Sequence, residues 1–318
     1  MSFYRRYIII FALAMIAGLA PKPLLFFANL GYPNMATYNC DGFFQVKDSY
    51  ANSINAPKIM FISGSNTLFG VDTEKIEKEF RIPTVNYGVA APLHFYIFHR
   101  AKKYIHSGDT VILPLEYDFY DDDKMNPSLG YVAYIAGYDP AFFYDMSFVD
   151  KIIFIKSMNI QTLIKITWKR IILAENEDDE HYDRKYLNKN GDMTYNPVAK
   201  KKDLTTYMGE MFPNDSISSD AQKELEDFIS YCHQSNITVY AAWPNLLHGE
   251  KKFSDKDLGR IHAIEAFYRE NDVEILGNYN DCIYDAELFY DSCYHLNEEG
   301  KRIHTDYLIR LLKEKLNR

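Results

Sequence analysis

The residues best suited to chemistry are a serine near the start of the chain and a histidine near its end. Ser65 stands in the stretch "FISGSNTLFG", directly after Gly64 and behind an apolar run. His295 stands in "YDSCYHLNEEG", four residues after Asp291. A serine hydroxyl becomes a nucleophile when an adjacent base removes its proton, and a histidine base needs an acceptor that orients its other ring nitrogen. These residue types predict ester chemistry.

Ester chemistry also needs backbone N–H groups that face the developing oxyanion, and glycine-containing turns allow that approach. The stretch "NYGVAA" supplies Gly88 behind a second short apolar run. We expect Asn66 and Asn86 to bind substrate or to brace these turns, and Asn245 to line the pocket.

Each assignment has a structural alternative. Ser65 could be a loop serine or a helix cap, and Ser63 is a competing hydroxyl two residues earlier. His295 could simply precede a helix that Asn297 caps. Gly88 could serve only as a turn.

The elements that must position these residues alternate along the chain. Short apolar runs predict five strands at 58–63, 83–88, 109–117, 237–244 and 272–276. Segments of helical spacing lie around them, at 71–80, 92–108, 218–236 and 254–271, and a long amphipathic helix closes the chain. This alternation predicts an α/β fold, a three-layer α/β/α sandwich around a mainly parallel five-stranded sheet. Chemistry in such sheets collects outside the carboxyl ends of the strands.

The pattern is interrupted in the middle of the chain. Residues 31–56 read as an irregular lead-in, and about 118–215 as a helical insertion within one domain, 31–318. The insertion holds a charged run, "ENEDDEHYDRKY", which is typical of a solvated loop.

Residues 1–30 predict a membrane anchor. Arg5 and Arg6 precede an uncharged run from Tyr7 to Ala20, which is shorter than the roughly 20 residues that span a bilayer. Pro21 directly after a small-residue stretch disfavours cleavage, so an uncleaved signal anchor is favoured over a removed signal peptide or a buried helix. The two arginines place the N-terminus in the cytoplasm and the body outside it.

Composition excludes some classes of function. A net charge of −9 argues against nucleic-acid binding. The four cysteines form no metal-binding spacing, and Cys282 and Cys293 either pair or stay free. We expect no metal or cofactor, since neither a G-x-G-x-x-G nor a P-loop pattern follows a predicted strand.

The order of these blocks resembles the SGNH (GDSL-type) hydrolase superfamily, in its membrane-tethered branch related to bacterial polysaccharide O-acetylation and teichoic acid D-alanylation proteins. Ser65 after Gly64 matches the nucleophile, Gly88 the oxyanion-hole glycine, and Asp291 with His295 the final block. Two departures are visible. Asp291 stands four residues before the histidine, with Ser292 at the usual three, so a backbone carbonyl is the alternative acceptor. Glu116 or Tyr117 stands where the family has an oxyanion-hole asparagine, so we expect Glu116 to bind substrate rather than to stabilise the oxyanion.

The resemblance implies a membrane-anchored extracytoplasmic serine acyltransferase or esterase that acts on cell-envelope polysaccharide through an acyl-enzyme. Its implied partners are a membrane acyl donor, such as a membrane-bound acyltransferase, and a glycan or lipid-linked acceptor. The alternative is a catalytically inactive SGNH-like partner of an envelope polysaccharide-modifying assembly.

Overall fold

The computed structural model describes residues 21–34, 37–171, 182–197, 212, 214–248 and 253–316. The apolar run of the expected anchor, within residues 1–20, lies outside these ranges, as does most of the charged run at 175–186. Among the described residues, no helix has the length and apolar character that a bilayer span needs.

The predicted α/β architecture is confirmed. Five parallel strands form one sheet in the order β2-β1-β3-β4-β6. They are β1 (Ile59–Phe61), β2 (Thr84–Asn86), β3 (Thr110–Leu113), β4 (Thr238–Ala242) and β6 (Glu274–Leu276). Each strand lies within or close to a predicted apolar run, because strands buried on both faces are apolar throughout. A separate pair, β5 (Leu246–Leu247) with β7 (Ile283–Tyr284), is also parallel.

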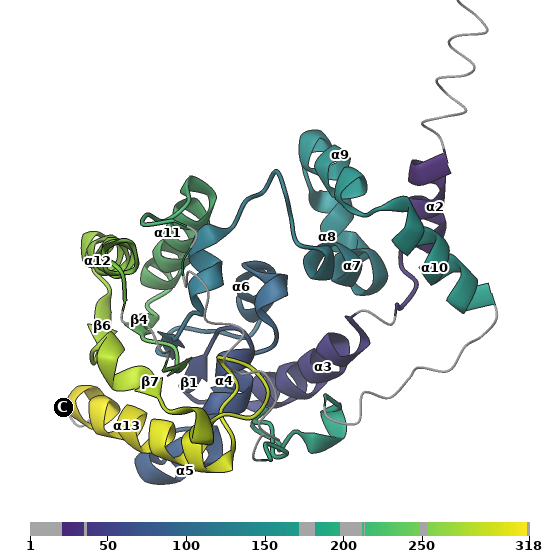
Figure 1. Cartoon of the computed structure of the whole chain (residues 1–318). Helices are drawn as coiled ribbons and strands as arrows, with labels where there is room; N and C mark the ends of the chain where they lie inside the picture. Colours follow the sequence, from purple (N-terminus) through teal and green to yellow (C-terminus); the bar gives the residue numbers. More distant parts are fainter. Residues whose placement is uncertain are drawn as a thin grey trace, which may run out of the picture. The chain divides into compact units, whose positions relative to one another are not determined.

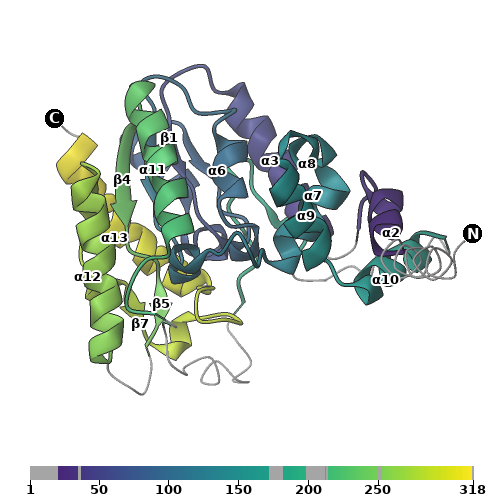
Figure 2. The same cartoon turned by 90° about the horizontal axis from the view of Figure 1, so that it is seen from above.

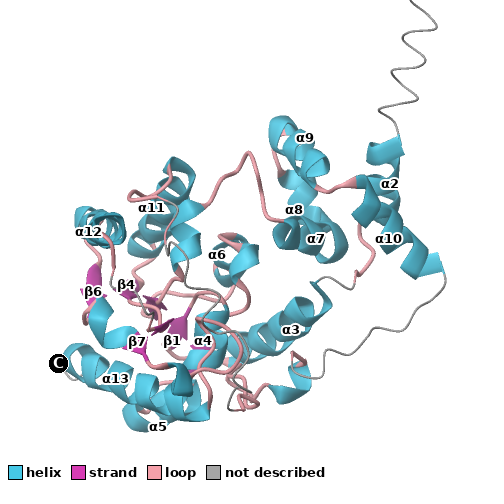
Figure 3. Ribbon diagram, in the orientation of Figure 1, coloured by secondary structure: helices cyan, strands magenta, loops and turns pink. Residues whose placement is uncertain are grey.

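Helices cover both faces of the sheet (Figures 1 and 3). One layer holds α5 (Thr73–Phe80) and α13 (Glu298–Leu316), and the other holds α6 (Tyr96–Ala101), α11 (Ser219–Gln234) and α12 (Asp255–Glu270). Alternate strand residues such as Ile59 and Phe61 pack with Ile76 of α5 and Leu308 of α13 in one buried cluster. This burial fixes which strand ends meet at the carboxyl edge of the sheet.

The remaining elements fall into two sets. The first set is α3 (Tyr38–Ser53), α4 (Ser65–Gly70), η2 (Ala91–Leu93), η3 (Tyr117–Asp121), η4 (Arg184–Tyr186), η6 (Tyr279–Cys282) and η7 (Ala286–Leu288). The second is α2 (Pro21–Asn29), α7 (Leu129–Tyr138), α8 (Pro140–Asp145), α9 (Phe148–Ser157) and α10 (Ile160–Ile171).

Contacts divide the chain into two units. Unit 1 comprises Met1–Asp41 and Lys124–Asp178, and unit 2 comprises Gly42–Asp123 and Asp179–Arg318, with the sheet. These bounds differ from the expected boundary at residue 30. Within unit 1, Phe26 of α2 is buried against Phe143 and Phe154. Residues 182–197, which we assigned to the insertion, belong to unit 2.

The expected irregular lead-in at 31–56 is wrong for most of its length, because α3 occupies Tyr38–Ser53. The buried residues of α3 include Phe43, Phe44 and Lys47. A lysine in the core weakens the apolar period that signals a helix. Lys47 Nζ instead donates to the carbonyl oxygen of Asn86 at 2.9 Å, which gives the buried amino group a hydrogen-bond partner. Of the open cysteine alternatives, the structure shows free thiols at Cys282 and Cys293.

Candidate active site

The turn after β1 is held by hydrogen bonds to the segment after β3. Ser63 is fully buried, and its Oγ lies 2.8 Å from the carbonyl oxygen of Pro114 and 2.9 Å from Asn66 Oδ1. The Nδ2 of Asn66 donates to the same carbonyl at 2.7 Å. Ser63 and Asn66 therefore brace the turn, while Ser65 remains partly exposed. Ser63 is thus a structural hydroxyl.

Ser65 begins the short helix α4, directly after Gly64 at its N-cap. Its Oγ donates to Glu116 Oε1 at 3.1 Å, and the backbone N–H of Asn66 donates to the same oxygen at 2.7 Å. A Cβ on Gly64 would lie 2.5 Å from that oxygen. Glycine is therefore needed here so that the Glu116 carboxyl can approach the start of α4.

Glu116 is buried, with 2% of its surface exposed. Burial raises its pKa to about 7, against the opposing effects of the Asn66 N–H, the His295 charge and the Ser65 hydroxyl. The nearby Asp118 charge raises the pKa further. A carboxyl with such a pKa exchanges its proton near neutral pH, beside the candidate nucleophile.

His295 and Asp291 form a close pair. The Nδ1 of His295 lies 2.6 Å from Asp291 Oδ1. Burial raises the pKa of Asp291, but the hydrogen bonds from His295 and Tyr182 and the charge of His295 together hold it below its ordinary value. The four-residue spacing is accommodated because Ser292 Oγ accepts from the backbone N–H of His295 at 3.2 Å and so shapes the turn. The carboxylate, and not a backbone carbonyl, contacts Nδ1.

His295 also lies against the helix that carries Ser65. Its ring stacks on Phe69, with centroids 4.3 Å apart and an interplanar angle of 20°. Phe69 follows Ser65 by four residues, so the two side chains lie on one face of α4. The structure shows no hydrogen bond between Ser65 and His295; both residues are described, and the partner of the Ser65 hydroxyl is Glu116.

Gly88 and Asn86 do not face a developing oxyanion in this structure. The Gly88 N–H donates to Asn86 Oδ1 at 3.0 Å, and Asn86 Nδ2 donates to the carbonyl oxygen of Thr67 at 2.8 Å. A Cβ on Gly88 would lie 2.7 Å from the Gly64 carbonyl oxygen and from the Leu68 nitrogen. Our expectation of a free Gly88 amide is therefore not met, because this glycine lets α4 approach β2 and its amide holds the turn.

Asn245, which lies between β4 and β5, is fully buried beside the histidine segment. Its Nδ2 donates to the carbonyl oxygen of Tyr294 at 2.6 Å. A Cβ added at Gly70 would lie only 2.4 Å from the Oδ1 of Asn245. This oxygen has no hydrogen-bond partner among the described residues. Asn245 thus links β4 to the residue that precedes His295, a positioning role.

Two aromatic residues of the site were missed by sequence reasoning. Tyr182 donates from its hydroxyl to Asp291 Oδ2 at 2.5 Å and lies 3.1 Å from His295 Nδ1. It is one of two tyrosines in the charged run that we interpreted as a solvated loop, and nothing in the run distinguishes it as a site residue. Phe69 lies on α4, which is too short for a recognisable helical period.

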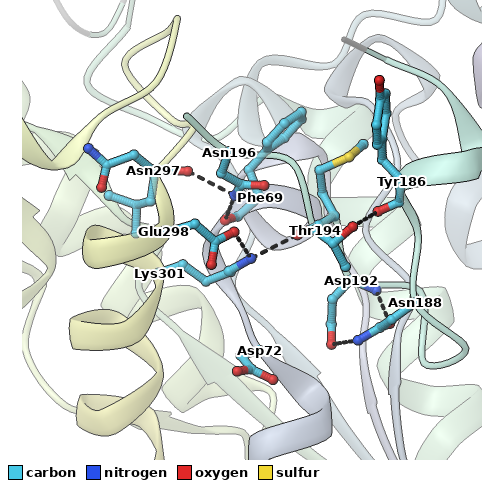
Figure 4. Close-up of polar contacts among 12 residues, drawn as sticks. Phe69, Asp72, Tyr186, Asn188, Asp192, Thr194, Asn196, Asn297, Glu298 and Lys301 are labelled. Atoms are coloured by element: carbon cyan, nitrogen blue, oxygen red, sulfur yellow. Dashed lines mark hydrogen bonds and ion pairs between the residues drawn. The ribbon is translucent and has the colours of Figure 1, made fainter. Parts of the chain in front are cut away.

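The segment 182–197 ties α4 to the start of α13 (Figure 4). Asn196 Nδ2 donates to the carbonyl oxygens of Phe69 at 2.8 Å and of Leu296 at 3.0 Å. Lys301 Nζ donates to the carbonyl oxygen of Met193 at 2.8 Å (Figure 4). The segment therefore fixes the distance between the residues that flank Ser65 and those that flank His295.

Nearby, Asp192 fastens the same segment to the sheet unit. This buried carboxylate accepts from Thr73 Oγ1 at 2.7 Å and from Asn86 Nδ2 at 3.0 Å. The turn-rich composition of "NKNGDMTYNP" fits this use, since Asn and Asp side chains readily bond to neighbouring backbone and polar groups.

Within the part of the chain that the structure describes, no group of three or more His, Cys, Asp or Glu side chains has the arrangement of a metal site. The arrangement instead offers a partly exposed hydroxyl, a carboxyl of near-neutral pKa and an imidazole paired with a carboxylate.

A scan against protein-family models finds no match for this chain, and a search of the curated proteins finds none either.

Proposed function

We propose that the chain is a membrane-anchored, extracytoplasmic serine acyltransferase or esterase of the SGNH type that acts on O-acyl groups of cell-envelope polysaccharide. The observation that carries this proposal is the stacking of His295, already paired with Asp291, on Phe69 one helical turn after Ser65. The extracytoplasmic location rests on Arg5 and Arg6 before the apolar run.

In the proposed reaction, Ser65 Oγ attacks the acyl carbonyl carbon and its proton passes to His295. The new C–O bond forms as the carbonyl electron pair moves to the oxygen. Collapse of this intermediate expels the donor alkoxide, which takes the proton from His295. A glycan or lipid-linked hydroxyl, or water, then attacks the acyl-enzyme by the reverse sequence, with Asp291 orienting the ring throughout.

Ser65 must turn before this transfer, because its hydroxyl donates to Glu116. The staggered χ1 rotamers of a serine differ by about 120°. A change of one rotamer breaks the hydrogen bond from the Ser65 hydroxyl to the Glu116 carboxyl. We assign to Glu116 the positioning of Ser65 and of the bound substrate. A membrane acyl-donor partner is the source of the acyl group in this scheme.

A second candidate function is a catalytically inactive partner in an envelope polysaccharide-modifying assembly. The observation that favours it is the occupancy of the expected oxyanion donor Gly88, whose N–H donates to Asn86. The N–H of Asn66, the residue after Ser65, is also engaged, by Glu116. An enzyme of this type needs donors aimed at the oxyanion.

Labelling of the full chain by a fluorophosphonate probe in detergent micelles separates the two. We expect the unsubstituted chain and Ser63→Ala to be labelled and Ser65→Ala to remain unlabelled, with hydrolysis of an acetyl-ester chromophore falling at least about 10³-fold in Ser65→Ala. Ser63→Ala is the matched control, since it removes a hydroxyl from the same turn. Equal labelling or equal hydrolysis in the chain and Ser65→Ala overturns the enzymatic proposal.

A further inference from the structure

Exposed large apolar side chains are concentrated in unit 1. Among the described residues, fourteen are strongly exposed, and thirteen of them belong to unit 1, with Tyr195 in unit 2 as the exception. Those of unit 1 are Leu24, Phe27, Tyr32, Tyr38, Met125, Leu129, Tyr144, Phe148, Val149, Ile152, Ile160, Ile164 and Trp168. Scattered exposed apolar residues are normal, but a concentration of this kind marks an interaction surface.

Helix α10 shows the pattern most clearly. Ile160, Ile164 and Trp168 recur every four residues and so form one stripe along the helix, and Trp168 is 62% exposed. Leu163 is fully buried and forms a separate inner face, and Thr167 contacts Asn29 of α2 through a hydrogen bond. The helix therefore has an apolar inner face for packing and an apolar outer face toward solvent.

Two other helices of unit 1, α2 and α9, repeat this arrangement. Helix α2 contacts both α10 and α9. In α2, Phe26 is buried while Leu24 is 67% exposed. In α9, Phe154 is buried while Phe148 is 77% exposed. We call the exposed apolar residues of α2, α9 and α10 the outer face of unit 1.

Charge identifies the kind of partner. The sequences of α2, α9 and α10 contain six basic residues and one acidic residue, a balance of +5 in a chain of net charge −9. The basic residues are Lys22, Lys151, Lys156, Lys165, Lys169 and Arg170, and the acidic residue is Asp150. Apolar side chains with a tryptophan and surrounding lysines are the composition of helices that lie in the interface of an anionic bilayer.

The position of these helices in the chain supports the same partner. Pro21, the first residue of α2, directly follows the uncharged run from Tyr7 to Ala20. We propose that the outer face of unit 1 lies in the headgroup region of an anionic phospholipid bilayer, beside the apolar N-terminal run. This inference is independent of the acyl chemistry proposed for unit 2.

Tryptophan fluorescence can test the proposal in the full chain. The sequence has two tryptophans, and Trp243 is buried in unit 2, so Trp243→Phe isolates the signal of Trp168. This variant is reconstituted into vesicles of phosphatidylcholine and phosphatidylglycerol, with or without bromine near the glycerol end of the acyl chains. We expect brominated lipid to reduce Trp168 emission by roughly half or more, as for side chains seated at the headgroup boundary.

A matched control moves the probe to unit 2. Tyr195→Trp, in a chain whose natural tryptophans are both replaced by phenylalanine, should show no quenching by brominated lipid. If Trp243→Phe fails to fold, the unsubstituted chain serves instead, with Trp243 as an unquenched background. Vesicles of phosphatidylcholine alone should quench Trp168 less, and equal quenching there overturns the assignment to anionic headgroups.

Two outcomes overturn the whole proposal. One is equal Trp168 emission in brominated and plain vesicles, although the chain migrates with the vesicles in a flotation gradient. In that case the chain is bound to the membrane but the outer face of unit 1 does not contact lipid. The other is Trp168 emission that is equal with and without bromine but changes with the number of chains per vesicle. That result assigns the outer face of unit 1 to contact with a second copy of the chain.

Discussion

The hydroxyl of Ser65 donates to Glu116 Oε1 at 3.1 Å, which joins the turn after β1 to the segment after β3. The carboxyl oxygen also accepts from the Asn66 N–H at 2.7 Å. One buried acid thus accepts hydrogen bonds from both the candidate nucleophile and the first turn of α4, so its protonation state affects how firmly both are held.

The Glu116 carboxyl makes the free energy of unfolding depend on pH. Burial raises its pKa from 4.5 to about 7, so between these values the folded chain holds a proton that the unfolded chain has released. Stability from this group is therefore full below about pH 4.5 and is lost as pH rises to about 7, by on the order of 3 kcal/mol. We expect Glu116→Gln, which keeps an acceptor oxygen, to lack this loss. Thermal unfolding of the unsubstituted chain and of Glu116→Gln across pH 4.5 to 8 measures the difference. If the stability of both proteins depends on pH in the same way, the assignment to Glu116 is contradicted.

Asp291→Asn should impair catalysis more than folding. The amide cannot stabilise a positively charged imidazole at Nδ1, which now lies 2.6 Å from the carboxylate. We expect kcat on an acetyl ester to fall about 10²- to 10⁴-fold with little change in KM. Tyr182→Phe keeps the aromatic ring but removes the hydroxyl, and its kcat should fall no more than about tenfold. A fall in Tyr182→Phe larger than in Asp291→Asn contradicts the assigned roles.

Gly88→Ala should destabilise the fold strongly. Its Cβ would meet backbone atoms of Gly64 and Leu68 at 2.7 Å, and these cannot move without shifting α4. We expect a loss of about 2–4 kcal/mol in the free energy of unfolding. Gly42→Ala is the matched control, because its Cβ would meet the flexible side chain of Arg184 at 3.3 Å. That variant should stay within about 1 kcal/mol. Denaturant unfolding measures both, and similar losses in the two variants contradict the packing argument.

Asn196→Ala should loosen the connection between α4 and α13. It removes donors to the carbonyl oxygens of Phe69 and Leu296, both buried contacts. We expect a loss of about 1–3 kcal/mol, together with lower acetyl-ester hydrolysis. Thr194→Val removes an exposed hydrogen bond from the same segment and should cost less than about 1 kcal/mol. Unchanged stability in Asn196→Ala, measured by denaturant unfolding, counts against the connecting role.

The sheet could be predicted from the sequence because its five strands are short and mainly apolar, and because several of the helices between them carry N-cap side chains. Asp72 illustrates the second signal, since its side chain accepts from the Lys75 N–H at 2.9 Å as an N-cap. Helix α3 could not be predicted in the same way, because Lys47 occupies a core position that only tertiary contacts to Asn86 and Gly191 satisfy.

The candidate site was predicted in part. Chain order predicted that Ser65 and Glu116 lie at one edge of the sheet, and the structure joins them by a hydrogen bond. The contact of His295 with Phe69 and Tyr182 depends on how distant segments pack, which no local pattern encodes. The hydrogen bond from the Gly88 N–H to Asn86 Oδ1 is instead local, because asparagine side chains often accept from the backbone two residues further on, so this use of the amide could have been expected from the sequence.

The bonds of Asn196 also bear on biosynthesis. They join residues 127 and 100 positions apart, and Tyr182 meets His295 across 113 positions. A chain that leaves the ribosome or a translocon N-terminus first therefore exposes Ser65 long before the imidazole and its supports emerge. The candidate site can therefore form only after the segment that carries His295 has emerged, because its contacts are between residues far apart in the chain.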